Sequence, residues 1–526
     1  MKHQQLLAPD VYNLVDEIEK HAHGKKKALL VHHENGEIEE ITYVELIKKA
    51  NQVANTLINN GLTKGDVILV MVPRSVEAYI TYIGALKAGL AIIPSSELLR
   101  AKDIDYRIIH AEAKAVVANE QYIKEFDEVN HLDGLSLFVI GQAHAPWISL
   151  MEEAKSAATT FTGVETKASD TAFIAYTSGT TGNPKGAVHT HSWGYAHLRT
   201  TAESWLGVSD GDIVWATAAP GWQKWIWSPF LAALGSGATA FVYTGKFDAE
   251  IYLNLLQNIK VNVLCCTPTE YRIMAKAENL NTYNLSALRN AVSAGEPLNR
   301  EVIETFLREF NVQVRDGYGQ TESTLLVGTL VGMEPRPGSM GKPTPGNYIE
   351  VIDEDGIPVE AGIVGDIAVH KSTPALYKGY LKDQERTQMQ FRGEWFITGD
   401  RARKDEDGYF WFEGRGDDII ISSGYTIGPF EVEDALVKHP AVRECAVVAS
   451  PDAVRGSIVK AFVVLRDPTQ KDNPTIIKEL QDHVKDLTAP YKYPRAIEFL
   501  DELPKTISGK IRRVELRQNE QNKQLS

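Results

Sequence analysis

Apolar runs that alternate with amphipathic helical segments constrain the fold of this chain more than any other feature. Residues 41–61, ITYVELIKKANQVANTLINNG, begin with Thr42 and Glu45 at capping-box spacing and end at a glycine that can close a helix. A short β-branched run follows at residues 66–73, and the same pair of patterns recurs at residues 75–89 and 90–95. Strands that alternate with helices of this length predict βαβ units and a largely parallel sheet.

The pattern changes along the chain and predicts its domains. Between about residues 340 and 412, short strands are interrupted by Asp-Gly turns, which is typical of antiparallel hairpins. After GRGDD at residues 414–418, helix and strand patterns return for roughly 100 residues, a normal domain size. We expect an α/β protein with an N-terminal domain at residues 1–415, a hinge at 416–418 and a small, mobile C-terminal α/β domain at 419–526. Its last ten residues, RQNEQNKQLS, predict a polar tail.

Composition excludes several classes of protein. The 526 residues carry a net charge of −14, which argues against nucleic-acid or anionic-membrane surfaces because both attract basic patches. Cys265, Cys266 and Cys445 cannot build a disulfide framework, and the adjacent pair is predicted to be buried in the core. No signal-peptide pattern and no apolar run of ~20 residues is present, so we expect a cytoplasmic protein. The sequence leaves a monomer and a homodimer equally open.

The sequence YTSGTTGNPKG at residues 176–186 predicts a phosphate-binding loop. It follows an apolar strand pattern, and glycines at 179 and 182 can expose backbone N–H groups toward one point, beside several hydroxyls and Lys185. A Walker loop is excluded, because Pro184 stands where that motif needs its second glycine. The alternative is a flexible surface loop. The tight combination of proline and lysine behind a buried strand disfavours that alternative.

This loop closely resembles that of the adenylate-forming (ANL) superfamily, which includes acyl-CoA synthetases, peptide-synthetase adenylation domains and luciferases. Further motifs of that superfamily follow in order over nearly the whole chain: SAGEPL, DGYGQTE, WFITGD, FEGRGDD and LPKTISGKIRR. The resemblance is to the group of medium-chain and acetyl-CoA synthetases. It implies a ligase that uses ATP, Mg²⁺ and coenzyme A. An acid would form an acyl-adenylate with release of pyrophosphate, and transfer to CoA would then give acyl-CoA and AMP.

The resemblance also assigns roles to single residues. Tyr318 would stack on adenine, Thr321 would contact the α-phosphate, and Glu322 would hold Mg²⁺, a hard cation for which one carboxylate plus phosphates suffices. Lys185, Glu322 and Lys510 are the implied catalytic residues. The implied ATP- and AMP-binding residues are Thr177, Ser178, Gly179, Thr180, Thr181, Gly182, Gly295, Glu296, Pro297, Asp316, Gly317, Tyr318, Gly319, Gln320, Thr321, Asp400 and Arg415.

The C-terminal motifs imply a mobile domain that carries the catalytic lysine. Lys510 would bridge the acid and the α-phosphate, and Asp417 matches the hinge position. The blander alternatives are a solvated basic tail around Lys510 and a surface ion pair between Arg415 and Asp417. The implied CoA-binding residues are Ser423, Gly424, Tyr425 and Lys485. Thr426 stands where relatives have a phosphate-binding arginine, so either Lys485 substitutes for it or nucleotide or CoA is held more weakly.

The acyl pocket is expected to involve Trp222, Lys224, Trp227 and Gly319, while Trp225 is assigned to the core. Acetate-activating relatives have tryptophan at the position of Gly319, so the sequence favours a medium-chain, branched or aromatic acid over acetate. A stand-alone enzyme that loads a carrier-protein phosphopantetheine is the alternative within the family. Amino-acid substrates are disfavoured, because no aspartate lies in APGWQKW. A non-catalytic nucleotide sensor is disfavoured by the intact lysines and Glu322, and nothing in these motifs indicates luciferase oxidation.

Overall fold

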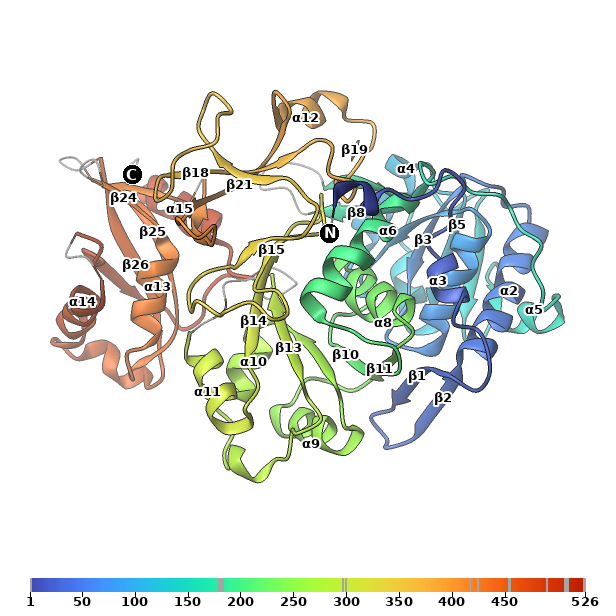
Figure 1. The fold of residues 1–526 in the computed structure, drawn as a ribbon, viewed down its shortest axis with the longest axis horizontal. Coiled ribbons are helices and arrows are strands. Elements are labelled where there is room, and N and C mark those ends of the chain that lie inside the picture. Colours follow the sequence, from blue (N-terminus) through green and yellow to red (C-terminus); the bar gives the residue numbers. More distant parts are fainter. Residues whose placement is uncertain are drawn as a thin grey trace. The chain divides into compact units, whose positions relative to one another are not determined.

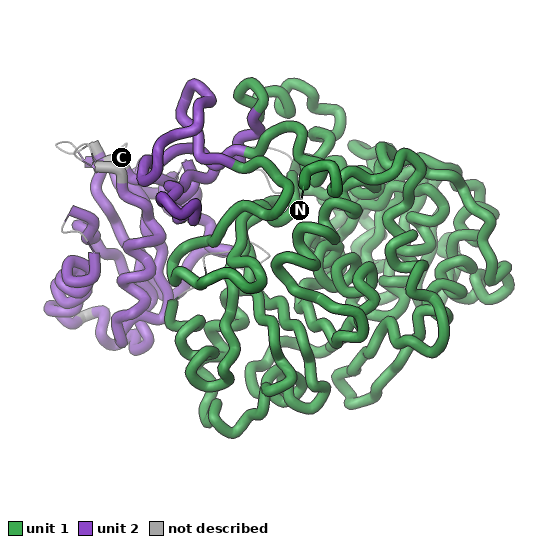
Figure 2. Tube along the Cα trace, viewed as in Figure 1, with its two compact units in different colours: residues 1–349, 369–394 green, residues 350–368, 395–526 purple. Residues whose placement is uncertain are grey.

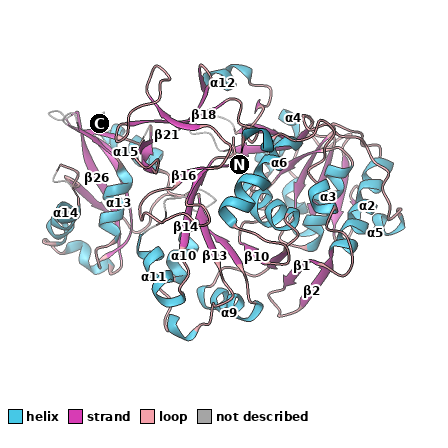
Figure 3. Cartoon of the chain, in the orientation of Figure 1, coloured by secondary structure: helices cyan, strands magenta, loops and turns pink. Residues whose placement is uncertain are grey.

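The computed structural model describes residues 2–177, 184–295, 298, 300–416, 418–422, 425–452, 456–488, 491–505 and 510–523. Two compact units contain them: one comprises residues 1–349 and 369–394, and the other comprises residues 350–368 and 395–526 (Figure 2). Helices and strands occur in both units (Figure 3). The α/β fold predicted from the sequence is confirmed. Because residues 395–415 group with the C-terminal residues, the domain boundary at residue 415 and the hinge remain predictions.

The first unit contains two large sheets, in which most strand pairs are parallel (Figure 1). One has the order β19-β9-β8-β4-β3-β5-β6-β7 and the other β16-β15-β14-β13-β12-β10-β11-β1-β2. The strands of this unit are β1 (Lys27–His32), β2 (Ile38–Thr42), β3 (Val67–Met71), β4 (Ala91–Pro94), β5 (Ala115–Asn119), β6 (Ser136–Ile140), β7 (Ile148–Ser149), β8 (Thr171–Thr177), β9 (Lys185–Thr190), β10 (Ile213–Ala216), β11 (Thr239–Tyr243), β12 (Val263–Cys266), β13 (Asn290–Ala294), β14 (Val314–Gly319), β15 (Leu325–Gly328), β16 (Lys342–Pro343), β19 (Gly379–Tyr380) and β20 (Phe391–Arg392).

Helices connect these strands, as the alternation in the sequence predicts. They are η1 (His3–Leu6), α1 (Asp16–Glu19), α2 (Tyr43–Asn59), α3 (Val76–Lys87), α4 (Ala101–Ala111), η2 (Glu120–Phe126), α5 (Leu150–Ser156), α6 (His191–His197), η3 (Leu198–Leu206), α7 (Gln223–Trp225), η4 (Ile226–Ala232), α8 (Ala233–Gly235), α9 (Ala249–Ile259), α10 (Pro268–Met274), η5 (Leu280–Thr282), α11 (Arg300–Phe310) and α12 (Gln384–Met389). None of the described helices is long and apolar enough to cross a bilayer.

Helix α2 illustrates how local sequence fixes these elements. The Thr42 hydroxyl accepts a hydrogen bond from the Glu45 N–H, and the Glu45 carboxylate accepts one from the Thr42 N–H, so the predicted capping box is confirmed. Leu46, Val53 and Leu57 face the core and are fully buried. Each such side chain contributes about 1.5–3 kcal/mol relative to an exposed one, so packing rather than capping supplies most of the stability of this helix.

The second unit is richer in antiparallel strands. Strand β22 pairs antiparallel with β21, as the Asp-Gly turns predict, and β25, β26 and β27 form a separate sheet that packs with α13, α14 and α15. Its elements are β17 (Ile349–Ile352), β18 (Val364–His370), β21 (Trp395–Lys404), β22 (Phe410–Arg415), β23 (Ile420–Ser422), β24 (Tyr425–Ile427), α13 (Pro429–Val437), β25 (Val442–Asp452), β26 (Gly456–Leu465), η6 (Pro468–Asp472), α14 (Ile476–Leu487), β27 (Ala496–Phe499) and α15 (Arg513–Lys523).

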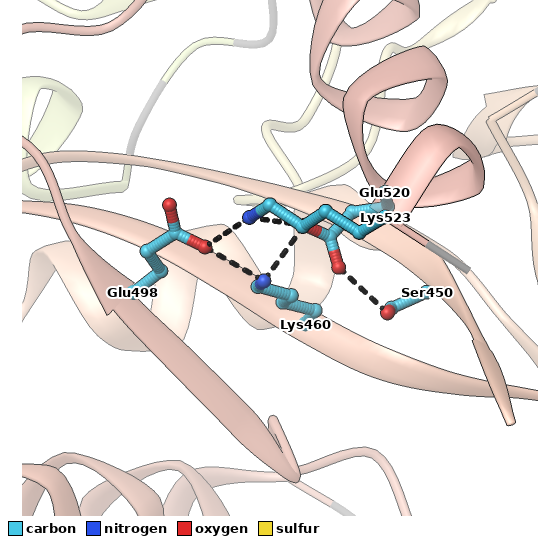
Figure 4. Close-up of polar contacts among 5 residues, drawn as sticks. All are labelled: Ser450, Lys460, Glu498, Glu520 and Lys523. Atoms are coloured by element: carbon cyan, nitrogen blue, oxygen red, sulfur yellow. Dashed lines mark hydrogen bonds and ion pairs between the residues drawn. The ribbon is translucent and has the colours of Figure 1, made fainter. Parts of the chain in front are cut away.

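An ion-pair network ties α15 to the sheet of the second unit. The ammonium of Lys460, on β26, lies 2.7 Å from carboxylate oxygens of both Glu498 and Glu520, and Lys523 contacts the same two carboxylates (Figure 4). The Ser450 hydroxyl donates to Glu520 at 2.8 Å. Burial by itself would raise the pKa of Glu520, but its hydrogen bonds from Lys460 and Ser450 outweigh burial and lower it. The polar tail predicted for residues 517–526 is therefore wrong as far as Lys523, where the helix ends.

Candidate active site

Strands β8 and β9 present the predicted phosphate loop. They pair antiparallel up to Thr177 and Lys185, which lie opposite each other at the point where the chain leaves the sheet. The predicted residues between them, Ser178, Gly179, Thr180, Thr181 and Gly182, lie outside the described residues, as do Glu296 and Pro297. The loop begins at the carboxyl end of β8, the end at which α/β sheets bind ligands. It returns into an antiparallel strand, so both of its ends are held by one hairpin.

The side chains of Lys185 and Glu322 meet at Tyr380. The Lys185 ammonium lies 4.8 Å from the centre of the Tyr380 ring, and the Tyr380 hydroxyl donates to a carboxylate oxygen of Glu322 at 2.7 Å. The backbone N–H of Tyr377 donates to the Glu322 carbonyl, also at 2.7 Å. Two motifs more than 130 residues apart in the sequence therefore converge on one aromatic ring.

The protonation state of Tyr380 makes it a hydrogen-bond donor. Burial raises the pKa of this phenol, and the neighbouring Glu322 carboxylate raises it further, so the hydroxyl keeps its proton and can orient Glu322. No group of three or more His, Cys, Asp or Glu side chains that could hold a metal occurs among the described residues. Glu322 is a single carboxylate, and one carboxylate together with phosphate oxygens is a donor set that suits Mg²⁺, so its role in metal binding stays a prediction. No sequence motif marks Tyr380, and its signal in the sequence is the aromatic pair in ALYKGY.

Side chains from β9 and α6 hold the segment that contains Glu322. The ring of His189 donates from Nε2 to the Thr321 carbonyl at 2.6 Å, and Trp193 donates from its indole nitrogen to the Ser323 carbonyl at 2.9 Å. His197 lies one helical turn beyond Trp193, and its Nδ1 is 2.6 Å from the hydroxyl of Thr324. These contacts fix the backbone on both sides of Glu322.

Both histidines are neutral at physiological pH. Burial lowers the pKa of His189 to about 4 and that of His197 to about 3. The Nε2 of His197 lies 2.8 Å from the Trp227 carbonyl, which can only accept, so Nε2 carries the proton and Nδ1 accepts from Thr324. The sequence analysis missed these residues, although the spacing in HTHSWGYAH was a signal, since Trp193 and His197 lie four residues apart.

The DGYGQTE segment, residues 316–322, begins within β14 and continues past its carboxyl end. Burial raises the pKa of Asp316 to about 7, against the opposing effect of the Gly317 N–H, which donates to its carboxylate at 2.8 Å. A Cβ atom added at Gly319 would lie 2.2 Å from the Thr324 carbonyl oxygen, so the backbone itself requires glycine there. The idea that Gly319 also enlarges an acyl pocket stays a prediction. Gly295 adopts a φ of +110°, which favours glycine.

The predicted acyl-pocket residues differ in burial and in their contacts. The Lys224 ammonium lies 4.8 Å from the ring centre of Trp205 and 5.4 Å from that of the buried Trp227. Trp205 was missed, and it donates to the Asp316 carbonyl at 3.0 Å. Trp222 is 38% exposed. Trp225 is 1% exposed and lies in the main core, which confirms the role predicted for Trp225.

Cys265 and Cys266 are buried free thiols, as predicted.

In the second unit, Asp400 and Arg415 lie opposite each other on β21 and β22. The guanidinium Nε of Arg415 is 3.9 Å from a carboxylate oxygen of the buried Asp400. Asp417, the predicted hinge residue and alternative partner of Arg415, lies outside the described residues. So do Ser423 and Gly424, and only the backbone of Tyr425 and Thr426 is described. The ammonium of Lys485 is 2.8 Å from the Asp482 carboxylate.

The segment that carries Lys510 is anchored on both sides. Lys505 pairs with Glu444 at 2.7 Å, and Arg513 donates twice to Glu433, at 3.0 and 2.7 Å. These contacts and helix α15 argue against a solvated basic tail. Lys510 itself is exposed.

The resemblance assigns Glu322 to Mg²⁺, and replacing Tyr380 with phenylalanine is then expected to weaken the contribution of this carboxylate to adenylation. A hydrogen bond to a charged group contributes about 1.5–3 kcal/mol, so the Mg²⁺ concentration that gives half-maximal adenylation should rise about 10-fold or more. Magnesium titration of ATP–pyrophosphate exchange measures this shift. Tyr195→Phe is the matched control, because the ring of Tyr195 packs against Arg199 instead. An unchanged magnesium requirement in Tyr380→Phe would contradict the orienting role.

Comparisons with known proteins cover nearly the whole chain. Residues 18–381 match the AMP-binding enzyme family, and residues 431–510 match the AMP-binding enzyme C-terminal domain. The uncharacterized acyl-CoA ligase YtcI of Bacillus subtilis (strain 168) is 60% identical over 99% of this chain and 98% of its own length. Mouse mitochondrial acyl-coenzyme A synthetase ACSM3 is 40% identical over 92% of this chain and 85% of its own. The crystal structure of the anthranilate CoA ligase AuaEII in complex with anthranoyl-AMP is 28% identical, with a TM-score of 0.91 and full coverage of both chains.

Proposed function

Because the chain belongs to the AMP-binding enzyme family and is an acid–thiol ligase of the acyl-CoA synthetase type, we propose that it activates a medium-chain, branched or aromatic acid rather than acetate. The convergence of Lys185 and Glu322 on Tyr380 carries the adenylation part of this proposal. It would bring a cation and a carboxylate to the phosphates of a bound nucleotide. The similarity to a ligase of anthranilate, an aromatic acid, supports the proposed substrate class.

In the proposed first half-reaction, a carboxylate oxygen of the acid attacks the α-phosphorus of ATP. The bond to pyrophosphate breaks and an acyl-adenylate remains, so no nucleophile from the protein is needed. The phosphate loop and Lys185 would neutralise the leaving pyrophosphate, and Lys510 would bridge the acid and the α-phosphate. Tyr318 would stack on adenine and Asp400 would accept hydrogen bonds from the ribose. Glu322 would hold Mg²⁺, which supplies further charge neutralisation at the phosphates.

In the second half-reaction, the thiol sulfur of CoA attacks the carbonyl carbon of the adenylate. The carbon–oxygen bond to AMP breaks, the thiol proton is lost to solvent, and acyl-CoA forms. Ser423, Gly424 and Tyr425 would line the path of the pantetheine arm. Lys485 pairs with Asp482 at the surface, and such a pair contributes little, so either Lys485 would substitute for the missing arginine at Thr426 or nucleotide or CoA would be held more weakly. We place the enzyme in the cytoplasm, since its cysteines are free thiols.

The test is acid-dependent ATP–pyrophosphate exchange over a panel of short, medium, branched and aromatic acids. We expect exchange with medium-chain, branched or aromatic acids, little exchange with acetate, and faster AMP release when CoA is added. Exchange without any effect of CoA would favour the alternative acceptor, a carrier-protein phosphopantetheine. Absence of exchange with every acid, in the presence of magnesium, would refute the proposal.

A further inference from the structure

The helical segment that begins at Gln223 carries buried polar atoms without partners. These are the ammonium nitrogen of Lys224, the indole nitrogen of Trp227 and both amide atoms of Gln223, none of which has a hydrogen-bond partner in the part of the chain that the structure describes. Helix α7 continues directly into η4, and Trp227 lies three positions after Lys224 and four after Gln223. Trp227 is therefore a neighbour of each of the other two residues along the helix surface.

Of these polar groups, the Lys224 ammonium is the most unfavourable to bury without a hydrogen-bond partner. A lysine ammonium has three donors and no acceptor, and burying an unpaired charge is strongly destabilising. The rings of Trp205 and Trp227 attract the cation but supply no lone pair. His197, whose pKa the Lys224 charge helps to lower, already uses both ring nitrogens in bonds to Thr324 and Trp227. The described surroundings thus attract this cation without satisfying its hydrogen bonds.

The position of Lys224 connects it to the proposed reaction. Trp205, one of its two aromatic neighbours, bonds to the backbone of Asp316, and His197 bonds to Thr324. Both contacts lie on the segment that contains Thr321 and Glu322, where the proposed function places the reacting acid. A half-buried position that needed only bulk beside these two indoles would be served better by an apolar side chain such as methionine, which needs no hydrogen-bond partner.

We infer that Lys224 binds a hydrogen-bond-accepting oxygen on the acyl group of the substrate, in addition to the carboxylate that reacts. The enzyme would then prefer acids that carry such an oxygen, for example an oxo group, over apolar acids of the same length. This inference rests on the proposed function. The inference narrows the substrate class to acids with an oxygen on the acyl group, because a longer apolar chain would supply no hydrogen-bond acceptor to the Lys224 ammonium.

The experiment compares hexanoate with 3-, 4- and 5-oxohexanoate in ATP–pyrophosphate exchange by the full-length protein. At least one oxo acid should exceed hexanoate in kcat/KM by about 10-fold or more, as expected for a hydrogen bond to a charged group. In Lys224→Met this ratio should fall by about 10- to 100-fold. Lys224→Arg keeps a cation and should keep a preference for the oxo acid. Lys246→Met removes an exposed lysine of the same unit and should leave the ratio unchanged.

The outcomes separate the inference from the proposed function. Wild-type protein that prefers hexanoate to every oxo acid would overturn the inference without any variant. So would an equal loss for both acids in Lys224→Met, because Lys224 would then act on the shared carboxylate or on folding. Melting temperatures of the variants identify a folding defect. Absence of exchange with every acid in the wild type would instead refute the proposed function.

Discussion

Replacing Lys510 with alanine is expected to slow acyl-adenylate formation by about 10²–10³-fold, the usual cost of removing one electrostatic group that acts in a transition state. Transfer to CoA from a supplied acyl-adenylate should be affected far less, because that step needs no bridge to the α-phosphate. Lys510 is exposed, and its segment is anchored by Lys505 and Arg513, so the substitution should not unfold the domain. ATP–pyrophosphate exchange measures the first step, and thioester formation measures the second.

Lys438→Ala is the matched control for Lys510→Ala. Lys438 lies on the surface of the same unit, in an ion pair with Asp434 one helical turn away, and such pairs contribute little. Its loss should leave both steps within about two-fold of the wild type. Full adenylation activity in Lys510→Ala would show that some other cation performs the proposed role.

Replacing Asp417 with proline is expected to spare adenylation and to slow transfer to CoA by roughly 10²-fold, the effect of misplacing reacting groups by about 1 Å. Proline fixes φ near −65° and removes a backbone N–H, so it restricts rotation at this position. The positions on either side are anchored: the Gly416 N–H donates to the Gly399 carbonyl at 2.8 Å, and Asp418 pairs with Arg517 of α15. A hinge between these two anchors would act at residue 417.

Single-turnover assays of each half-reaction measure the effect of Asp417→Pro. Asp417→Ala is the control, because it removes the same carboxylate but leaves the backbone free to turn. The hinge proposal would be wrong if proline slowed both half-reactions equally, or if alanine reproduced the selective loss.

Local rules predicted those parts of the fold in which neighbouring residues decide the structure. The capping box at Thr42, the strand before the phosphate loop and the burial of Trp225 all follow from short-range patterns, and the structure confirms them. The prediction of a polar tail was wrong because it considered composition alone. Composition records that residues 517–523 are polar, but it does not record that a buried lysine on β26 binds Glu520.

Motifs predicted candidate site residues but did not predict the neighbouring residues that hold them in position. Lys185 and Glu322 were found because each lies in a recognisable stretch. Tyr380, which joins them, and His189, which bonds to the backbone beside Glu322, come from segments without such motifs. Only the pairing of β9 with β19 and the packing of α6 bring these segments together, and no single sequence shows those long-range contacts. The glycine at 319 was noticed for its possible effect on a pocket, whereas the structure shows a backbone requirement.

The enclosed position of Glu520 makes helix α15 part of the domain's interior. Lys460 is 9% exposed, and one of its two counterions comes from a helix that ends at residue 523. Trimming the protein before that helix would remove Glu520 from Lys460 and would also remove Leu516, which would uncover the apolar side chains that pack with it, such as Phe462. A truncated protein that lacks α15 would therefore lose the stability of the domain that carries Lys510.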